Sequence, residues 1–345
     1  MEHQAHHTSR TYQMLFILLV AALLGITACS PANTTANAAM TPVTFQMGWF
    51  HDYSASPFQQ AETNGHFTAA GLDVTVNPGG FDSEGNYINP LNALLNGDAQ
   101  FGTISSSTLL LERAKGTPLV AVASIAQRSP ISLISLAETG IVTPADLVGK
   151  TVAVTDDVAR YTLEALLNAQ EIPVDAVNIV PRPGFGIDPL LNGDVDALSG
   201  WILNEGLLVT EAGREPNILL YSDYGINSYS FLIVTTEKMI EDQPDVVQGM
   251  VQALIEGTQD VVNNLDKAAD VTVQYNSELN RDEQLARLQI FLPLINPPGE
   301  VLGNIDRAVL ELEHQLLLDN GLLTEAVDLD AAYTLEFINK VHQDA

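Results

Sequence analysis

Cysteine is almost absent from this chain of 345 residues, because Cys29 is the only one. No intramolecular disulfide can therefore form, and a catalytic thiol is not expected. Basic residues are also scarce: 14 Lys and Arg stand against 43 Asp and Glu, for a net charge of −29. This balance excludes the basic patch that nucleic-acid binding needs. We interpret the acidity as a solvated surface and assign it no functional charge patch.

Several motifs of catalysis and cofactor binding are missing as well. The chain has no Gly-x-x-x-x-Gly-Lys-Ser/Thr or Gly-x-Gly-x-x-Gly stretch to hold nucleotide phosphates. It has no Cys cluster or Asp-x-Asp-x-Asp-Gly loop for a metal, and no Gly-x-Ser-x-Gly turn for a hydrolase nucleophile. We therefore predict no cofactor, no metal site and no enzymatic activity.

The N-terminal region carries a strong targeting signal. An uninterrupted apolar run, Met14 to Ile26, follows Arg10 and precedes Thr27-Ala28-Cys29. The run is too short to cross about 30 Å of hydrocarbon and suits a signal peptide over residues 1–28. The small residues before Cys29 resemble a bacterial lipobox, in which the Cys becomes the lipidated first residue. We expect palmitate-type acylation at Cys29, a tether over 29–41, and attachment to the extracytoplasmic face of the cell membrane through the lipid anchor only. An ordinary secretory signal with an incidental Cys is the alternative.

Beyond residue 42 the pattern alternates between strands and helices. Apolar strand-like segments are predicted at 43–47, 72–76, 99–103, 118–125, 132–136, 151–154, 177–180, 195–198 and 231–235. Helical segments lie between them, whereas 77–89 is predicted to be one long loop because it is rich in Gly, Asn, Asp and Ser. This alternation predicts an α/β fold in which parallel or mixed sheets are flanked by helices.

One motif occurs twice. A short helix, an Asn-Gly-Asp turn and a strand follow one another at Leu94–Phe101 and again at Leu190–Leu198. The repetition suggests two similarly built lobes with a ligand cleft between them. We place lobe 1 at 42–130 plus 231–345 and lobe 2 at 131–230.

The predicted strand ends collect flat aromatic and uncharged hydrogen-bonding side chains. The C-terminal edge of the strands is where α/β folds bind ligands, so we predict a binding site there. The candidate ligand-binding residues are Trp49, Asp52, Tyr53, Ser105, Ser106, Ser107, Asp156, Tyr161, Trp201, Asn204, Glu205 and Asn227. Each has an alternative structural reading: Trp49 as a core aromatic, the Ser run as a helix cap and Tyr161 as part of a helix face.

Seven short segments together carry a family resemblance over about residues 43–264. They are Gly65-His66-Phe67 with Gly71-Leu72-Asp73-Val74; Phe101-Gly102 with Ser105-Ser106-Ser107; Ala114-Lys115-Gly116-Thr117-Pro118; Pro144-Ala145-Asp146-Leu147-Val148-Gly149-Lys150; and Asn192-Gly193-Asp194-Val195-Asp196-Ala197. The chain resembles the type II solute-binding proteins of ABC importers, in the group related to thiamine-pyrimidine synthase and to nitrate, sulfonate and taurine binding proteins. The resemblance implies a two-lobed periplasmic-binding-protein fold.

The ligand implied by the resemblance depends on the branch. The pyrimidine-binding branch has Trp-x-Pro-Asn-x-x-His-x-Pro after its first strand. Trp49 and Pro57 match it, but His51, Asp52 and Ala55 replace the Pro, the Asn and the His. The enzyme of that branch uses this His, so Ala55 argues against enzymatic use. Relatives that carry riboflavin are therefore slightly preferred, with Trp49 and Trp201 as walls for the ring and Ser105–Thr108, Asp156 and Asn204 as polar partners.

The resemblance also implies partners. We expect a monomer that passes a small molecule, either riboflavin or an aminopyrimidine, to an ABC permease and its ATPase. The alternatives are a thiamine pyrimidine precursor, a sulfonate or nitrate anion held by helix N-termini, and an extracytoplasmic sensor domain that docks a receptor.

Overall fold

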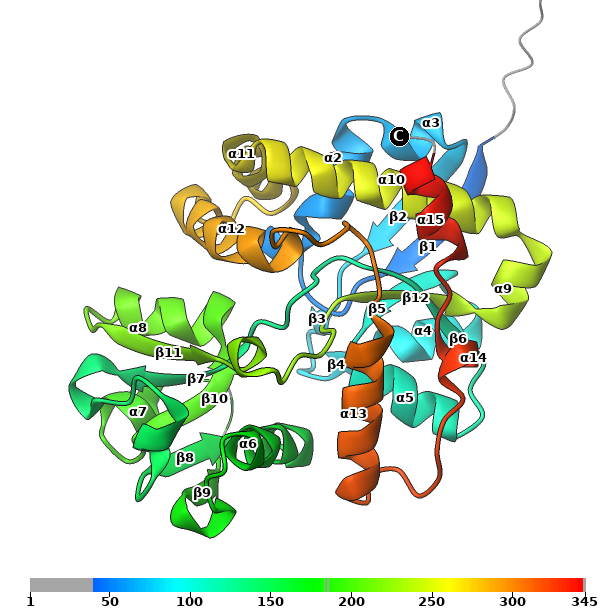
Figure 1. Ribbon diagram of the computed structural model, residues 1–345. Helices are drawn as coiled ribbons and strands as arrows, with labels where there is room; N and C mark the ends of the chain where they lie inside the picture. The colour runs from blue at the N-terminus through cyan, green and yellow to red at the C-terminus, as the bar shows by residue number, and fades with distance from the viewer. Residues whose placement is uncertain (1–39, 183, 185, 344–345) are drawn as a thin grey trace, which may run out of the picture. The chain divides into compact units, whose positions relative to one another are not determined.

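The computed structural model in Figure 1 describes residues 40–182, 184 and 186–343. The predicted signal peptide, Cys29 and all of the tether before Met40 lie outside the described residues. Residues 40–345 form one compact unit, and its first strand begins at Thr41. No helix within the described ranges has both the length and the apolar character needed to cross a bilayer.

The first sheet has the strand order β2-β1-β5-β12-β6. β1 pairs in parallel with β2 and β5, whereas β12 runs antiparallel to both β5 and β6. The C-terminal ends of β1, β2, β5 and β6 therefore share one edge. The strands are β1 (Thr41–Gln46), β2 (Leu72–Asn77), β5 (Phe101–Ile104), β6 (Leu119–Ser124) and β12 (Leu232–Thr236).

Helices cover both faces of this sheet (Figure 1). Alternation along β12 sends Ile233 into one core cluster and its neighbours Leu232 and Val234 into the other. The first cluster includes α2 (Ser56–Thr63), α3 (His66–Ala69), α10 (Pro244–Asn263), α11 (Leu265–Tyr275), α12 (Arg281–Ile295) and α15 (Glu336–Gln343). The second includes α4 (Pro90–Asn96), α5 (Ser106–Ala114), α13 (Arg307–Asp319) and α14 (Leu329–Ala332), and α9 (Glu237–Asp242) follows β12.

The second sheet has the order β11-β7-β10-β8-β9. β10, β8 and β9 run parallel, and β7 is antiparallel to β10 and β11. One face packs on α6 (Asp157–Ala169), and the other packs on α7 (Asp188–Leu191) and α8 (Leu207–Glu211). The strands are β7 (Ile131–Leu136), β8 (Thr151–Val154), β9 (Asn178–Pro181), β10 (Ala197–Trp201) and β11 (Pro216–Leu220). The prediction of an α/β fold with mixed sheets between helices is confirmed.

Two local predictions were wrong or incomplete. Residues 77–89 contain a small hairpin, β3 (Gly80–Phe81) with β4 (Tyr87–Ile88), where a continuous loop was expected. Strand β11 was not predicted, and a π-helix, η5 (Ile202–Gly206), follows β10. Both strands of the hairpin are too short to show a periodic pattern, so the turn residues dominated the local sequence signal.

Candidate functional site

The edge formed by the C-terminal ends of β1, β2 and β5 collects several of the predicted residues. Backbone hydrogen bonds fix the segment that follows β1. Gly48 N donates to Thr103 Oγ1 at 2.8 Å, and Gly79 N donates to Trp49 O at 2.7 Å. A side chain at position 79 would place Cβ 2.3 Å from Met47 O, so only Gly permits this approach. The backbone around Trp49 is therefore held tightly against the hairpin.

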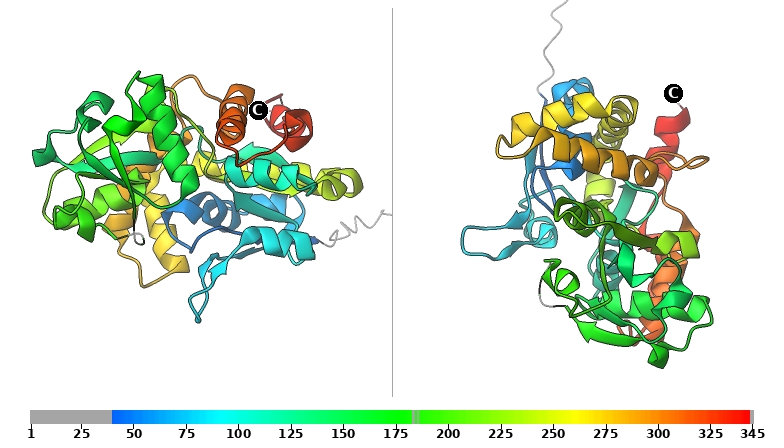
Figure 2. Two further views of the ribbon diagram at one scale, coloured as in Figure 1. Left: turned by 90° about the horizontal axis from the view of Figure 1, so that it is seen from below. Right: turned by 90° about the vertical axis from the view of Figure 1, so that its left-hand side faces the viewer.

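Four exposed aromatic side chains form a continuous group here, which we call the aromatic cluster. Its members are Trp49, Phe50, Phe81 and Tyr87, exposed by 38%, 39%, 42% and 48%. Trp49 contacts Phe50 at 5.2 Å and Phe81 at 5.9 Å, both edge-on, and Phe81 contacts Tyr87 at 5.9 Å between ring centroids. Tyr87 Oη donates to Gly48 O at 3.0 Å and so ties the hairpin to the loop after β1. The hairpin projects from the first sheet in both views of Figure 2.

The Ser run after β5 serves the start of α5. Ser105 is the N-cap, and its Oγ accepts from Thr108 N at 3.2 Å and contacts Ser107 Oγ at 2.9 Å. Ser106 is fully buried, accepts from Tyr229 N at 2.9 Å, and donates to a carboxylate oxygen of Glu313. Burial raises the pKa of Glu313 to about 7, and the hydrogen bond from Ser106 opposes the rise. Ser105 and Ser107 remain partly exposed at this edge.

A small cavity of about 20 Å³ lies beside Glu313. It has room for about one water molecule. Two predicted residues, Tyr161 of α6 and Asn227, line it together with Ser228 and Leu316. Asn227 also holds together the two segments that cross between the sheets, since its Oδ1 accepts from Ser129 N at 2.9 Å and its Nδ2 donates to Gln127 O at 3.0 Å.

Asp156 lies at the C-terminal end of β8 and is exposed. Its carboxylate is the N-cap of α6, accepting from Ala159 N at 2.8 Å. Asp52 has a similar role before the 3₁₀ helix η1 (Tyr53–Ala55), where it accepts from Ser54 N at 2.9 Å and from Ser54 Oγ at 2.6 Å. Burial raises the pKa of Asp52, although these hydrogen bonds and the charge of Arg287 oppose the rise.

A second group of polar and aromatic residues joins the two sheets, and we call it the junction. Its members are Tyr53, Trp201, Asn204, Phe231 and Arg287. Tyr53 Oη donates to Asn204 Oδ1 at 3.5 Å, and Arg287 Nη1 donates to the same oxygen at 2.9 Å. Arg287 lies over the Tyr53 ring at 5.8 Å, and Trp201 packs edge-on against Phe231 at 5.4 Å. Arg287 thus contacts Tyr53, which follows β1, and Asn204, which follows β10, and the Trp201–Phe231 contact joins the same two parts of the chain.

Glu205 is committed to contacts within the second sheet. Its side chain is buried, accepts from Trp201 N at 2.8 Å, and lies 2.9 Å from the guanidinium of Arg182. Arg182 Nη1 also donates to Ser199 O at 2.9 Å. The pair fixes the backbone at Trp201, where η5 begins.

The predicted residues thus fall into separate groups. Trp49 belongs to the aromatic cluster, whereas Tyr53, Trp201 and Asn204 meet at the junction; in the described part of the chain no ring contact joins Trp49 to Trp201.

Sequence reasoning missed Phe50, Phe81, Tyr87, Arg287 and Glu313. An aromatic residue on each side of the Asp-Ser-Glu-Gly-Asn turn was the available signal for the hairpin. Neither Arg287 nor Glu313 carries a local signal. No group of metal-ligating side chains occurs within residues 40–182, 184 and 186–343.

The fold is that of an α/β protein of the periplasmic-binding-protein type. The chain belongs to the NMT1/THI5-like family, whose model matches residues 54–268. It is 26% identical to the riboflavin-binding protein RibY of Chloroflexus aurantiacus over 95% of this chain and 97% of that protein. It is 26% identical to the formylaminopyrimidine-binding protein of Halalkalibacterium halodurans over 86% of this chain and 90% of that protein. The fold is similar to that of the periplasmic aliphatic sulphonate binding protein SsuA of Escherichia coli, with a TM-score of 0.66 at 15% identity, over 84% of this chain and 96% of that one.

Proposed function

We propose that this chain is the extracytoplasmic solute-binding component of an ABC importer, lipid-anchored through Cys29, and that it binds a small heteroaromatic compound without transforming it. In this proposal residues 42–130 plus 231–345 form one lobe and 131–230 the other. A ligand that touches both lobes stabilises their closed arrangement, so affinity and closure are one linked equilibrium. The monomer delivers its ligand to a permease and an ATPase.

The aromatic cluster is the observation that carries the proposal. Monomeric proteins rarely expose a contiguous group of large aromatic side chains unless it binds something. The cluster lies where parallel strands end, which is the edge at which α/β folds bind ligands. Flat, electron-rich faces suit a planar ring, and tightly bound backbone holds Trp49 in place before the ligand arrives.

Riboflavin is the preferred ligand. The relative RibY is named for riboflavin and is similar to this chain over nearly its whole length. The tricyclic ring of riboflavin is wide enough to contact several rings of the aromatic cluster at once, and Ser105, Ser107 and Asp156 offer hydrogen-bonding groups for a polyol tail. The formylaminopyrimidine class, named in the other relative, is the second candidate.

The first test is identification of the ligand itself. Protein purified under native conditions should retain a yellow chromophore that mass spectrometry identifies as a flavin, and added riboflavin should raise the melting temperature. Colourless protein that riboflavin does not stabilise would exclude riboflavin. If formylaminopyrimidine stabilised that protein, the heteroaromatic function would stand with the second ligand.

Truncation of Trp49 tests the role of the cluster. Trp49→Ala should weaken binding by about 1–3 kcal/mol, the range found when an aromatic side chain that stacks on a ring is removed. The melting temperature of the free protein should change little, because Trp49 is 38% exposed. Val148→Ala, an exposed apolar truncation in the part of the chain that contains the second sheet, should change neither quantity. Unchanged affinity with a lowered melting temperature would make Trp49 a core residue.

A further inference from the structure

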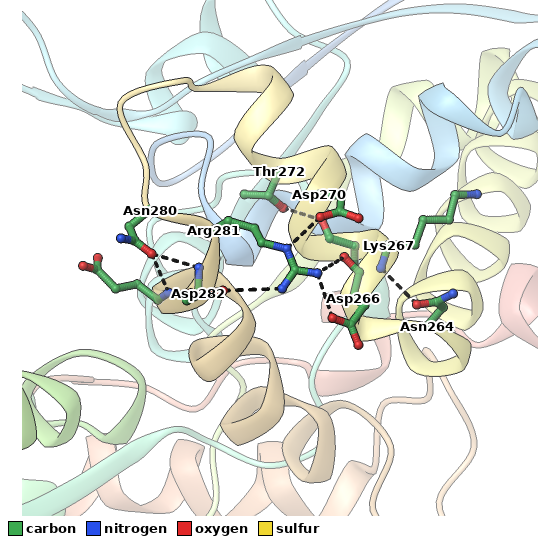
Figure 3. A network of polar contacts seen from close by, with 10 residues as sticks. Asn264, Asp266, Lys267, Asp270, Thr272, Asn280, Arg281 and Asp282 are labelled. Atoms are coloured by element: carbon green, nitrogen blue, oxygen red, sulfur yellow. Dashed lines mark hydrogen bonds and ion pairs between the residues drawn. The ribbon is translucent and has the colours of Figure 1, made fainter.

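Arg287 is unusual in this acidic protein because no described carboxylate oxygen lies within 4.0 Å of its guanidinium. Among the described Lys and Arg, all except Lys267 and Arg287 lie within 4.0 Å of a carboxylate oxygen. The contrast is clear within one helix. Figure 3 shows Arg281, at the start of α12, between Asp266 and Asp270. Its Nη2 lies 2.7 Å from Asp266 Oδ1, and its Nε lies 2.7 Å from Asp270 Oδ1. Arg287 lies further along the same helix and forms no ion pair with a described carboxylate, although its charge acts on the carboxyl group of Asp52.

The contacts of Arg287 leave one edge of its guanidinium free. Nη1 donates to Leu203 O at 2.6 Å and to Asn204 Oδ1 at 2.9 Å. Within residues 40–182, 184 and 186–343, Nε and Nη2 make no hydrogen bond and are not enclosed. This edge is the fork that Arg uses for paired hydrogen bonds to oxygen acceptors.

Asn204 presents a donor beside that fork. Its Oδ1 accepts from both Arg287 Nη1 and Tyr53 Oη, which fixes the orientation of the amide. Its Nδ2 therefore faces away from these two donors and has no hydrogen bond to a described residue. Glu205, a nearby acceptor, is already occupied by Arg182 and by Trp201 N. At the junction, the unused hydrogen-bonding groups of Arg287 and Asn204 are therefore donors.

We propose that Arg287 and Asn204 form the polar end of the ligand site and select a planar heteroaromatic ring that carries carbonyl oxygens along one edge, over a ring that carries amino groups there. Donors match carbonyl oxygens and leave a ring amino group without a partner, which costs binding energy in a closed site. The ring of Tyr53 lies against the guanidinium at 5.8 Å, and the Trp201–Phe231 pair is the other aromatic part of the junction. The inference rests on the proposed heteroaromatic function and specifies its ligand as one with a dione-type edge.

Titration of four probes against wild type and variants tests the inference. The probes are riboflavin, whose ring carries two carbonyl groups; acridine, a tricyclic ring with none; formylaminopyrimidine; and taurine, a sulfonate. Arg287→Gln and Asn204→Asp should each weaken riboflavin binding about 10- to 100-fold, the range for losing hydrogen bonds that involve a charged group. Binding of acridine should stay within about twofold. Lys267→Gln is the matched control and should change nothing, because Lys267 also lacks a carboxylate but is exposed and bonded to Asn64.

The outcomes separate this inference from the function on which it rests. Equal losses for riboflavin and acridine would make Arg287 a structural clamp and overturn the inference, as would no loss for either. Tighter binding of taurine than of riboflavin, lost in Arg287→Gln, would make the site an anion site. If wild type binds acridine and formylaminopyrimidine but does not bind riboflavin, the proposed selection for carbonyl groups is overturned and the heteroaromatic function stands. Binding of none of the aromatic probes would overturn both.

Discussion

Glu313 makes the stability of this protein depend on pH in a direction that can be calculated. The residue is only 9% exposed, and burial raises the pKa of its carboxyl group from 4.5 to about 7. The folded state therefore favours the neutral acid. The resulting stabilisation is fully present below pH 4.5 and is lost as the pH rises through about 7. Each pKa unit corresponds to about 1.4 kcal/mol, so the loss amounts to about 3 kcal/mol.

Glu313→Gln should remove this dependence. The amide oxygen can still accept from Ser106 Oγ, and the side chain no longer ionises. We expect wild type and variant to have similar free energies of unfolding near pH 5. Above pH 8 the variant should be more stable by about 3 kcal/mol, because only the wild type must bury a carboxylate.

Urea denaturation followed by far-UV circular dichroism, at intervals from pH 5 to pH 9, measures both free energies. The difference between variant and wild type is the relevant quantity, because His51 and His314, whose pKa values are lowered by burial, titrate in both proteins. Glu311→Gln provides the control, since Glu311 lies on the same helix but is exposed and pairs with Arg307. Its difference curve should be nearly flat. A flat curve for Glu313→Gln as well would refute the reasoning, and so would a variant that is less stable than wild type at pH 9.

Two further substitutions test how the site is held. Glu205→Ala should cost about 3–5 kcal/mol of stability, because it removes the carboxylate that lies 2.9 Å from the buried guanidinium of Arg182; a loss below about 1 kcal/mol in urea denaturation would contradict this. Gly80→Ala should destabilise the hairpin and weaken ligand binding, because φ at Gly80 is +86° and an added Cβ would lie 2.4 Å from the Phe50 ring. If calorimetric titration found unaltered affinity for the ligand, the hairpin would not be part of the ligand site.

The repeated helix–turn–strand motif shows what the sequence could predict. Gly97 ends α4 and Gly193 follows α7, with φ of 79° and 75°. In both copies the Asp after the Gly donates its backbone N–H to a carbonyl of the preceding helix at 2.9 Å. A strand of the corresponding sheet follows each copy. Local rules of helix termination decide such a motif, so it is visible without any tertiary information. The apolar stripe of α10 follows a local rule as well: Val247, Met250, Val251, Leu254, Ile255, Thr258 and Val262 recur at helical spacing in the sequence, and all are buried except Val262, which is partly buried.

The hairpin could not be predicted from local rules because distant contacts stabilise it. Its two strands have two residues each, and its interior is as polar as any loop. The structure depends on Gly79 N bonding to Trp49 O and on Tyr87 Oη bonding to Gly48 O. Arg287 and Glu313 were missed for a related reason: Arg287 binds Leu203 and Asn204, and Glu313 binds Ser106, all far away in sequence. Residues whose role comes from tertiary partners leave no periodic signal.

In the proposed site, the junction connects ligand recognition to the arrangement of the two sheets. Tyr53 and Arg287 follow or pack on the first sheet, whereas Leu203 and Asn204 belong to the π-helix after β10 of the second. Separation of the sheets would break the hydrogen bonds of Arg287, each worth about 1.5–3 kcal/mol. A ligand that accepts from the free edge of the same guanidinium and also from Asn204 Nδ2 would make both sets of hydrogen bonds in the joined arrangement and would lose one set on separation. The equilibrium would then shift toward closure by the difference between the ligand's binding free energies for the joined and for the separated arrangement. An arginine that already bridges the sheets is therefore well placed to make closure depend on the ligand, which a carboxylate-neutralised arginine such as Arg281 could not do.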